Sequence, residues 1–404
     1  MTPQPSPGAK DPVKSSAFIL FSYGFRPFFL FGALYAALLI LIWVPWFLGA
    51  ISLPTQFPPT AWHAHELLFG YVAAAIAGFL LTAVANWTSR PPASGPLLAG
   101  LFALWIAGRI SVAFSGVIGL IPVALICIAF PLCLAIVVGR EIIAGGNMRN
   151  LKILGLLLGF AAAQGLFHWE VLHHGRLVLA DRLAIAAVIV LIMLIGGRII
   201  PIFTGNWLKA HGDEKIPPRF NRFDTATMGV SVAALAAWAV SQGTFLKGLE
   251  GALLAGAAFI NLARQARWCP HRIGKEPLVA ILHGAYLFVP VGFALAAIGV
   301  FLEDRSATAA ATHAWTTGAI AAMTLGVMTR ASLGHTGRAL TASPATVFIY
   351  AAVLLAAAAR ILAALQPQWT MTLMPLAGVS WIAAFGGFAA VYGPKLLRPR
   401  LPKD

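Results

Sequence analysis

Charged side chains are scarce in this chain of 404 residues, because only 10% of them are Asp, Glu, Lys or Arg, whereas 59% are hydrophobic. Soluble globular domains carry about 25% charged residues, so this composition excludes a water-soluble protein. The net charge of +15 does not indicate nucleic-acid binding, because the basic residues alternate from one connection between apolar runs to the next. We therefore expect no nucleic acid among the partners, and we expect the lipid bilayer to be one.

Cysteine and the motifs of soluble enzymes are also missing. The three cysteines, Cys127, Cys133 and Cys269, form no Cys-x-x-Cys pair, which excludes a disulfide framework, and we expect no cysteine chemistry. The chain has no P-loop, no Rossmann glycine motif after a strand, no HExxH and no GxSxG. These absences exclude the common nucleotide-binding and hydrolytic classes.

Long apolar runs fill most of the chain, and each is long enough to cross a hydrocarbon layer of ~30 Å. The sequence predicts an all-α polytopic membrane protein with a polar tail over 1–19, one transmembrane domain over 20–393 and a basic tail over 394–404. We predict twelve spans, at residues 20–48, 62–85, 96–115, 118–139, 151–169, 180–202, 225–242, 246–263, 277–300, 309–329, 344–365 and 372–393.

Basic residues gather in alternate connections, which predicts the topology. One set of connections, with both tails, holds most of the lysines and arginines, whereas the other set holds only Arg176, Arg182, Lys247 and Arg305. The positive-inside rule therefore places both termini in the cytoplasm, in agreement with an even number of spans.

The cytoplasmic ends of spans two, six and ten resemble one another and lie four spans apart. They read Thr82–Trp87, Phe203–Trp207 and Met328–His335, and the first two end in Asn-Trp. This spacing predicts three four-helix repeats, since internal repeats are common in membrane folds. The alternative is that each Asn-Trp pair is only an interfacial anchor that follows a helix end.

Six of the ten histidines collect on the extracytoplasmic side in this topology: His63, His65, His168, His173, His174 and His313. Ionisable groups in membrane spans usually face the bundle interior and mark an ion path, a proton relay or a cofactor. Neutral imidazole is the commonest metal ligand and suits iron and copper. The alternatives are interfacial anchoring for the histidines that open span two and a solvated loop for the last pair, His173 and His174.

A haem in a helical bundle needs axial histidines from facing helices at matched depth, and His65 and His313 meet that condition. Copper needs two or three imidazoles close together, which His168, His173 and His174 offer, with His63 in addition. We expect Glu66 to orient an imidazole or to relay protons, and we assign it as the candidate catalytic residue.

Two arginines, Arg109 and Arg360, lie near the outer ends of spans three and eleven. Either could extend to the lipid headgroups, but arginine also pairs with buried carboxylates such as haem propionates. A second polar group lies toward the cytoplasm and includes His283. It would bind a second haem or serve a proton path, or it would simply hydrogen bond to a neighbouring helix backbone.

Several motifs along nearly the whole chain resemble the NnrS family of bacterial membrane proteins. They are Gly24–Phe29, Trp62–Glu66, Phe79–Val84 with Asn86-Trp87, Gly197-Arg198 through Pro201, Phe203-Thr204 with Asn206–Leu208, and Met328–Arg338. The resemblance implies a twelve-span protein of the bacterial inner membrane that contains haem b and copper. It also implies a link to denitrification and to defence against nitric oxide and nitrosative stress.

A looser likeness is to the catalytic subunits of haem–copper oxidases and nitric oxide reductases, which have twelve spans and low-spin haem ligands on spans two and ten. His65 and His313 match that arrangement. However, span six has no His-Pro-Glu-Val-Tyr-like motif, span ten has no His-x-His, and the double histidine lies in a loop. These departures predict that the binuclear oxygen-reducing centre is missing.

The sequence thus predicts an inner-membrane haem and copper protein that binds or turns over nitric oxide or a nitrosyl product, with an electron donor in the membrane. Such a protein would be an oxidoreductase if it turns nitric oxide over. Two other classes fit the same residues: a secondary transporter that exports a metal or a nitrosyl-iron complex, and a haem-binding sensor or assembly protein without turnover.

Overall fold

A computed structural model describes residues 16–174, 179–214, 216–241 and 247–402, which contain helices and no strand. The helices in chain order are α1 (Ser16–Leu20), α2 (Phe25–Phe47), α3 (Pro59–His65), η1 (Glu66–Val72), α4 (Ala73–Thr88), α5 (Gly95–Ala113), α6 (Ser115–Ile118), α7 (Leu120–Ala144), η2 (Met148–Asn150), α8 (Leu151–His174), α9 (Leu179–Ala210), α10 (Arg222–Val240), α11 (Lys247–Ala266), η3 (Pro270–Arg272), α12 (Pro277–Phe301), α13 (Arg305–His313), η4 (Ala314–Ala321), α14 (Ala322–His335), α15 (Pro344–Leu365), η5 (Pro367–Trp369) and α16 (Thr370–Leu396).

The described residues contain ten helices that are long and apolar enough to cross a membrane. They confirm the predicted class, an all-α polytopic membrane protein. The other two predicted spans are also helical, as α11 and as the continuous stretch α13–η4–α14. Both are more polar: α11 buries Glu250, Asn261 and Arg264, and α13 begins at Arg305 behind an Asp304 cap.

Apolar side chains also cover the outside of the bundle, as lipid contact requires. Leu125, Ile136, Phe259, Phe348 and Val379 are each at least 60% exposed. A water-soluble protein rarely exposes large apolar patches of this kind. The helices are therefore apolar both toward the core and toward the bilayer.

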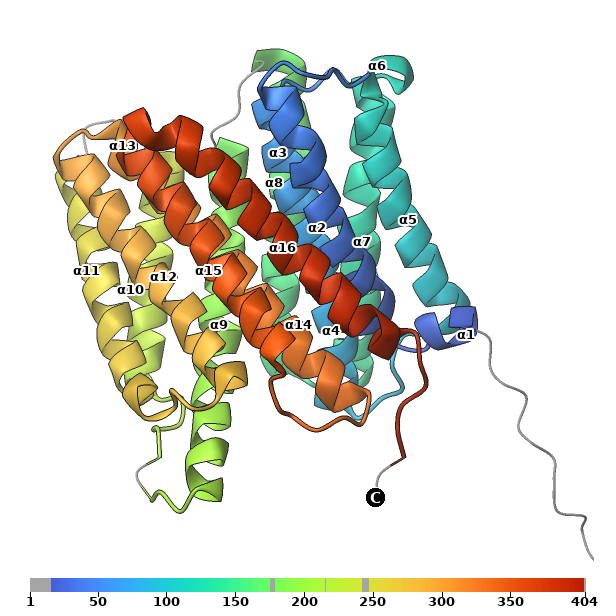
Figure 1. Cartoon of the computed structure of the whole chain (residues 1–404), viewed down its shortest axis with the longest axis vertical. Coiled ribbons are helices and arrows are strands. Elements are labelled where there is room, and N and C mark those ends of the chain that lie inside the picture. The colour runs from blue at the N-terminus through green and yellow to red at the C-terminus, as the bar shows by residue number, and fades with distance from the viewer. Residues whose placement is uncertain (1–15, 175–178, 215, 242–246, 403–404) are drawn as a thin grey trace, which may run out of the picture.

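The helices form two groups joined by the long helices α9 and α16 (Figure 1). One group contains α2 to α8, in which α7 packs on both α5 and α8, and the other contains α10 to α13. Helix α9 packs against α8 on one side and against α10 and α12 on the other, whereas α16 packs on both α15 and α2. Both described chain ends lie at the same end of the bundle (Figure 1).

Residues of the Gly24–Phe29 motif join the two chain ends. Arg26 Nη1 donates hydrogen bonds to the carbonyl oxygens of Leu396 (2.6 Å) and Arg398 (2.8 Å), at the C-terminus of α16. Gly24 lies so close to α4 that an added Cβ would be 2.5 Å from Leu81 Cβ. This motif therefore stabilises the packing of α2 against α4 and α16, at the end of the bundle opposite to most of the histidines.

Candidate functional site

Two π-helical segments begin directly after candidate ligand histidines. The helix that opens at Pro59 changes to π geometry from Glu66 to Val72, after His65, and α13 changes from Ala314 to Ala321, after His313. π-Helical turns are rare and occur frequently at functional sites. The backbone is therefore irregular at the two positions that sequence reasoning selected from spans two and ten.

The first site is a buried group of three metal-ligand side chains from three helices. His65 Nε2 and His168 Nε2 are 3.2 Å apart, and Cys127 Sγ lies within 4.8 Å of ligand nitrogens of both. All three side chains are at most 2% exposed. Phe57, Phe69 and Phe167 pack around the His65 ring, so the group is shielded from water.

Glu66 fixes the tautomer of His65. His65 Nδ1 donates to Glu66 Oε1 at 2.6 Å, Arg109 Nη1 donates to the same oxygen at 2.7 Å, and the Tyr35 hydroxyl donates to Oε2. A carboxylate held by two further donors accepts the Nδ1 proton, which leaves the Nε2 lone pair directed at His168. The arrangement presents His65 as a ligand through Nε2.

Room for this arrangement comes from Gly70 on the π-helical segment. An added Cβ at Gly70 would lie 2.6 Å from Arg109 Nη1 and 3.0 Å from Tyr35 Cε1. The Gly70 carbonyl accepts a hydrogen bond from Trp105 Nε1 at 2.9 Å. Helices α2 and α5 can therefore bring the tyrosine and the arginine against Glu66.

The chemistry of this group fits a soft transition-metal ion. Two imidazole nitrogens bound to one ion at about 2.0 Å with a tetrahedral angle lie about 3.3 Å apart, close to the observed 3.2 Å. A thiolate with two imidazoles is a ligand set that suits copper and zinc. His168 Nδ1 has no partner among the described residues.

The second site is a cavity of about 220 Å³ between the two helix groups. His63, His313, Arg360 and Asp181 line it together with Tyr71. Arg360 Nη2 donates to His313 Nε2 at 2.7 Å, and the His63 ring stacks on Trp43 with 4.0 Å between centroids. His63, in the helical turn before the first π-helical segment, and His313, directly before the second, therefore face one space.

Polar atoms around this cavity lack partners in the described part of the chain. His63 Nδ1 and Asp181 Oδ1 are buried without a hydrogen bond, and no carboxylate lies within ion-pair distance of Arg360 there. Buried polar groups without partners are costly. The donor set, two neutral imidazoles and a buried guanidinium, fits a haem with an acidic side group.

The structure divides the residues that sequence reasoning grouped together. His65 and His313 do not face a common site, because His65 points to His168 and His313 lies in the cavity with His63. Arg109 pairs with Glu66 and does not line the cavity, whereas Arg360 does. The predicted single haem site thus corresponds to two neighbouring sites.

The other predicted ligands lie elsewhere. His173 is exposed and stacks on Trp169 with 4.9 Å between ring centroids, and the side chain of His174 lies outside the described residues. His283 is buried, and its Nε2 is 2.9 Å from Thr204 Oγ1 of α9. His283 therefore contacts a neighbouring helix through a side-chain hydroxyl.

A third buried polar group surrounds Arg264 in the α9–α12 region. Arg264 Nε donates to Asp224 Oδ1 at 2.8 Å, and its Nη1 donates to Tyr286 Oη at 3.1 Å. Tyr286 in turn donates to Asn261 Oδ1 at 2.8 Å. Gly197 makes room for the guanidinium, since an added Cβ would lie 2.0 Å from Arg264 Nη2. This group joins α9, α10, α11 and α12.

Sequence reasoning missed two members of the first site, Cys127 and Tyr35. Cys127 lies in an apolar run with no second cysteine at a ligand spacing, so only the packing of α5, α7 and α8 brings it to the histidines. The sequence predicted no cysteine chemistry, whereas the structure places Cys127 beside His65 and His168 as a candidate ligand. The Glu66–Arg109 ion pair has no local sequence signal either, because 43 residues separate its members.

Fold and site together define a multi-pass helical membrane protein with a buried His/Cys/His group and an adjacent polar cavity. The chain belongs to the NnrS family, since a family model described as NnrS protein matches residues 19–400. No curated protein matches the chain. The match covers α2 to α16 and therefore both sites.

Proposed function

We propose that this protein acts in the bacterial inner membrane on nitric oxide or a nitrosyl product, with copper at the His65/His168/Cys127 group and haem b in the His63/His313/Arg360 cavity. The single observation that carries the proposal is the buried approach of three metal-ligand side chains from three helices. The link to nitric oxide is what the resemblance to the NnrS family implies. Both termini would be cytoplasmic, as the distribution of basic residues predicts.

The residues around the copper position orient the candidate ligand side chains even when no ion is bound. Glu66 Oε1 keeps the proton of His65 at Nδ1, so that Nε2 is free to ligate, and Arg109 and Tyr35 keep Glu66 in place. Phe57, Phe69 and Phe167 exclude water. Soft thiolate and imidazole ligands favour monovalent copper, which would supply one-electron chemistry there.

The cavity residues would hold a haem through different contacts. His63 and His313 offer imidazole nitrogens from facing helices and would hold the haem iron. Arg360 has no carboxylate partner among the described residues; it would release His313 Nε2, to which it now donates, and pair with a propionate. Asp181 brings a carboxyl to the same space and would hold a proton beside the bound gas.

A reduced-minus-oxidised optical spectrum of the detergent-purified protein, with metal analysis and a nitric oxide titration, tests this proposal. We expect haem bands that shift with nitric oxide, and copper in the metal analysis. A His63→Ala, His313→Ala double variant should lose the haem bands, whereas His283→Ala should keep them. A colourless, well-folded protein made with ample haem would contradict the proposal and favour a transporter.

A further inference from the structure

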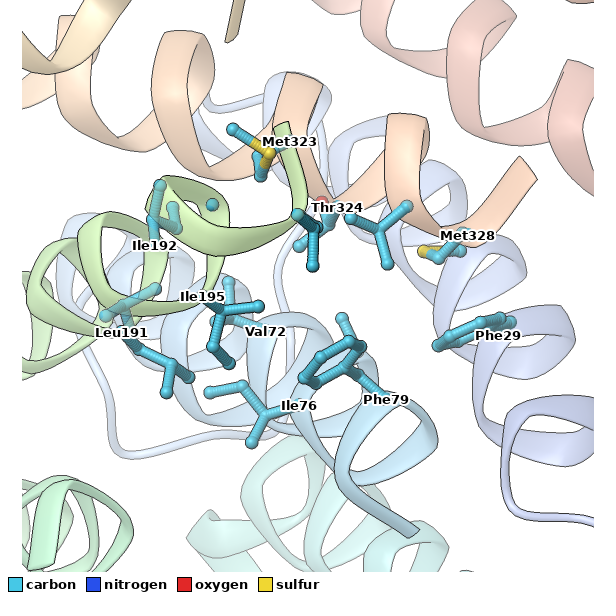
Figure 2. A pocket seen from close by; sticks show the side chains of 15 residues that line it. Phe29, Val72, Ile76, Phe79, Leu191, Ile192, Ile195, Met323, Thr324 and Met328 are labelled. Atoms are coloured by element: carbon cyan, nitrogen blue, oxygen red, sulfur yellow. The ribbon is translucent and has the colours of Figure 1, made fainter. Parts of the chain in front are cut away.

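An apolar cavity lies beside the polar one, in the middle of the bundle. It has a volume of about 70 Å³ and is lined by α2, η1, α4, α9 and α14. Figure 2 shows Leu191, Ile192 and Ile195 of α9 opposite Val72 and Ile76, with side chains of α14 on a third side. Aliphatic, aromatic and thioether side chains make up nearly all of the lining.

Water has nothing to bind in this cavity. Its one hydroxyl, that of Thr324, already donates to the Ile320 carbonyl at 2.8 Å and lies 2.5 Å from Tyr71 Oη. A buried water needs two to four polar partners, and apolar cavities of this kind stay dry while they bind xenon or small apolar molecules. The cavity therefore selects an uncharged, weakly hydrated occupant.

The cavity adjoins spaces on both sides. Val72 also lines the cavity that holds His63, His313 and Arg360, and Tyr71, which contacts Thr324, lines that polar cavity as well. On the other side Ile76, Val188 and Leu191 also line a narrow space between α4, α8 and α9. The three spaces form a series in which neighbouring spaces share lining side chains.

One side of the series meets the bilayer. Leu191, Ile195 and Ile199 are partly exposed on α9, in a helix that is long and apolar enough to span the membrane. An apolar gas concentrates in hydrocarbon relative to water, because water disfavours apolar solutes. The lipid-facing side of α9 is therefore where such a gas reaches the protein at the highest concentration.

The size of the cavity limits the occupant. A volume of about 70 Å³ admits molecules of diatomic size, and the apolar lining offers a hydrated ion no polar partners. Nitrite, nitrate and metal ions would lose their hydration shells without compensation. An uncharged diatomic gas fits both the size and the polarity.

We propose that this cavity is a binding site and passage for an uncharged diatomic gas, which enters from the bilayer beside α9 and passes Val72 and the Tyr71–Thr324 pair into the His63/His313/Arg360 cavity. The proposal rests on the proposed function for the identity of the gas and for the destination. Gas binding in the apolar cavity itself needs neither haem nor copper.

Xenon-pressurised crystals of the full chain and carbon monoxide rebinding after flash photolysis test the passage. We expect xenon in the apolar cavity of the unmodified protein. Ile192→Phe and Ile195→Phe place a larger side chain in the cavity, so xenon should be lost and carbon monoxide association should slow about tenfold, which corresponds to about 1.4 kcal/mol in the barrier. Carbon monoxide dissociation should not change.

Ile202→Phe is the matched control, because Ile202 lies seven residues further along α9, is 53% exposed and lines none of the three spaces. Its xenon occupancy and association rate should equal those of the unmodified protein. The proposed passage would be overturned by an ordered acyl chain in the cavity or by the absence of xenon there. It would also be overturned if carbon monoxide associated with Ile192→Phe and Ile195→Phe as fast as with the unmodified protein. A protein that lacks haem but binds xenon would instead contradict the proposed function alone.

Discussion

The His65 group and the Arg264 group both bury an arginine–carboxylate pair, yet only the His65 group brings metal-ligand atoms together. In the first, Glu66 accepts from Arg109 and also from His65, whose second nitrogen faces His168 and Cys127. In the second, Asp224 accepts from Arg264, whose guanidinium contacts Tyr286. Guanidinium only donates hydrogen bonds, whereas imidazole and thiolate offer lone pairs.

The comparison shows which buried polar residues in a membrane bundle indicate function. A buried arginine–carboxylate pair whose remaining contacts come from guanidinium nitrogens joins helices but offers a metal no lone pair. A buried ion pair that orients an imidazole toward other ligand atoms leaves a binding position. Substitutions in the two groups should therefore separate stability from metal binding.

The largest effect should follow the removal of Arg264. Arg264→Met removes the close partner of buried Asp224 and leaves only Arg267, whose Nη1 is 3.9 Å from Asp224 Oδ2. Breaking a buried ion pair costs about 3–5 kcal/mol. An unfolding titration in mixed detergent micelles measures this loss. Arg222→Met, at an exposed residue of the same region, should change stability by less than about 0.5 kcal/mol. Equal stability of the two variants would contradict a structural role for the Arg264 group.

Removal of His168 should instead affect metal binding. His168→Ala takes away one of three ligands, so we expect copper affinity to fall by more than the ~10–100-fold that loss of a ligand's outer hydrogen-bond partner costs. A competition titration with a chelator measures the Kd. His173→Ala, at the exposed histidine five residues further along α8, should bind copper as the unmodified protein does. Comparable losses in both variants would point to a different ligand set.

Glu66 should have an intermediate effect. Glu66→Gln keeps the shape but removes the charge that holds the His65 proton at Nδ1, and we expect copper affinity to fall by about 10–100-fold. Glu141→Gln serves as the control, because Glu141 pairs with Arg90 and Arg140 near the C-terminus of α7. If Glu66→Gln binds copper unchanged, the carboxylate does not set the tautomer.

A smaller loss of stability than that of Arg264→Met should come from Gly197. Gly197→Ala forces its Cβ against Arg264 Nη2, and overpacking of this kind costs about 1–3 kcal/mol. Gly229→Ala is the matched control, since an added Cβ there meets nothing within 4 Å. Its helix position favours alanine, so that variant should be neutral or slightly more stable. The same unfolding titration compares them, and neither variant should alter copper content.

Hydropathy predicted where the helices lie, because apolar runs of spanning length have few alternatives in a bilayer. Each of the twelve predicted ranges is helical over most of its described residues, although α11 and the α13–α14 stretch are more polar than the rest. Depth along the spans also predicted His65 and His168 at the same end of the bundle, and the structure brings them together. Depth alone could not pair them, because pairing depends on how helices rotate and pack.

Three features of the site had no signal in the sequence. The π-helical turns after His65 and His313 depend on contacts such as that of Trp105 with the Gly70 carbonyl. Cys127 becomes a candidate ligand only through the packing of α7 against α5 and α8. Arg264 lies among the basic residues that predict the cytoplasmic side, yet its side chain is fully buried against Asp224.

The copper content of three purified proteins tests the central claim most directly: the unmodified chain, Cys127→Ser and Cys133→Ser. Both cysteines lie on α7, but only Cys127 approaches His65 and His168. We predict one copper per chain in the unmodified protein and in Cys133→Ser, and none in Cys127→Ser after equal dialysis against a weak chelator. Equal copper in all three proteins, or zinc in place of copper, would contradict the account.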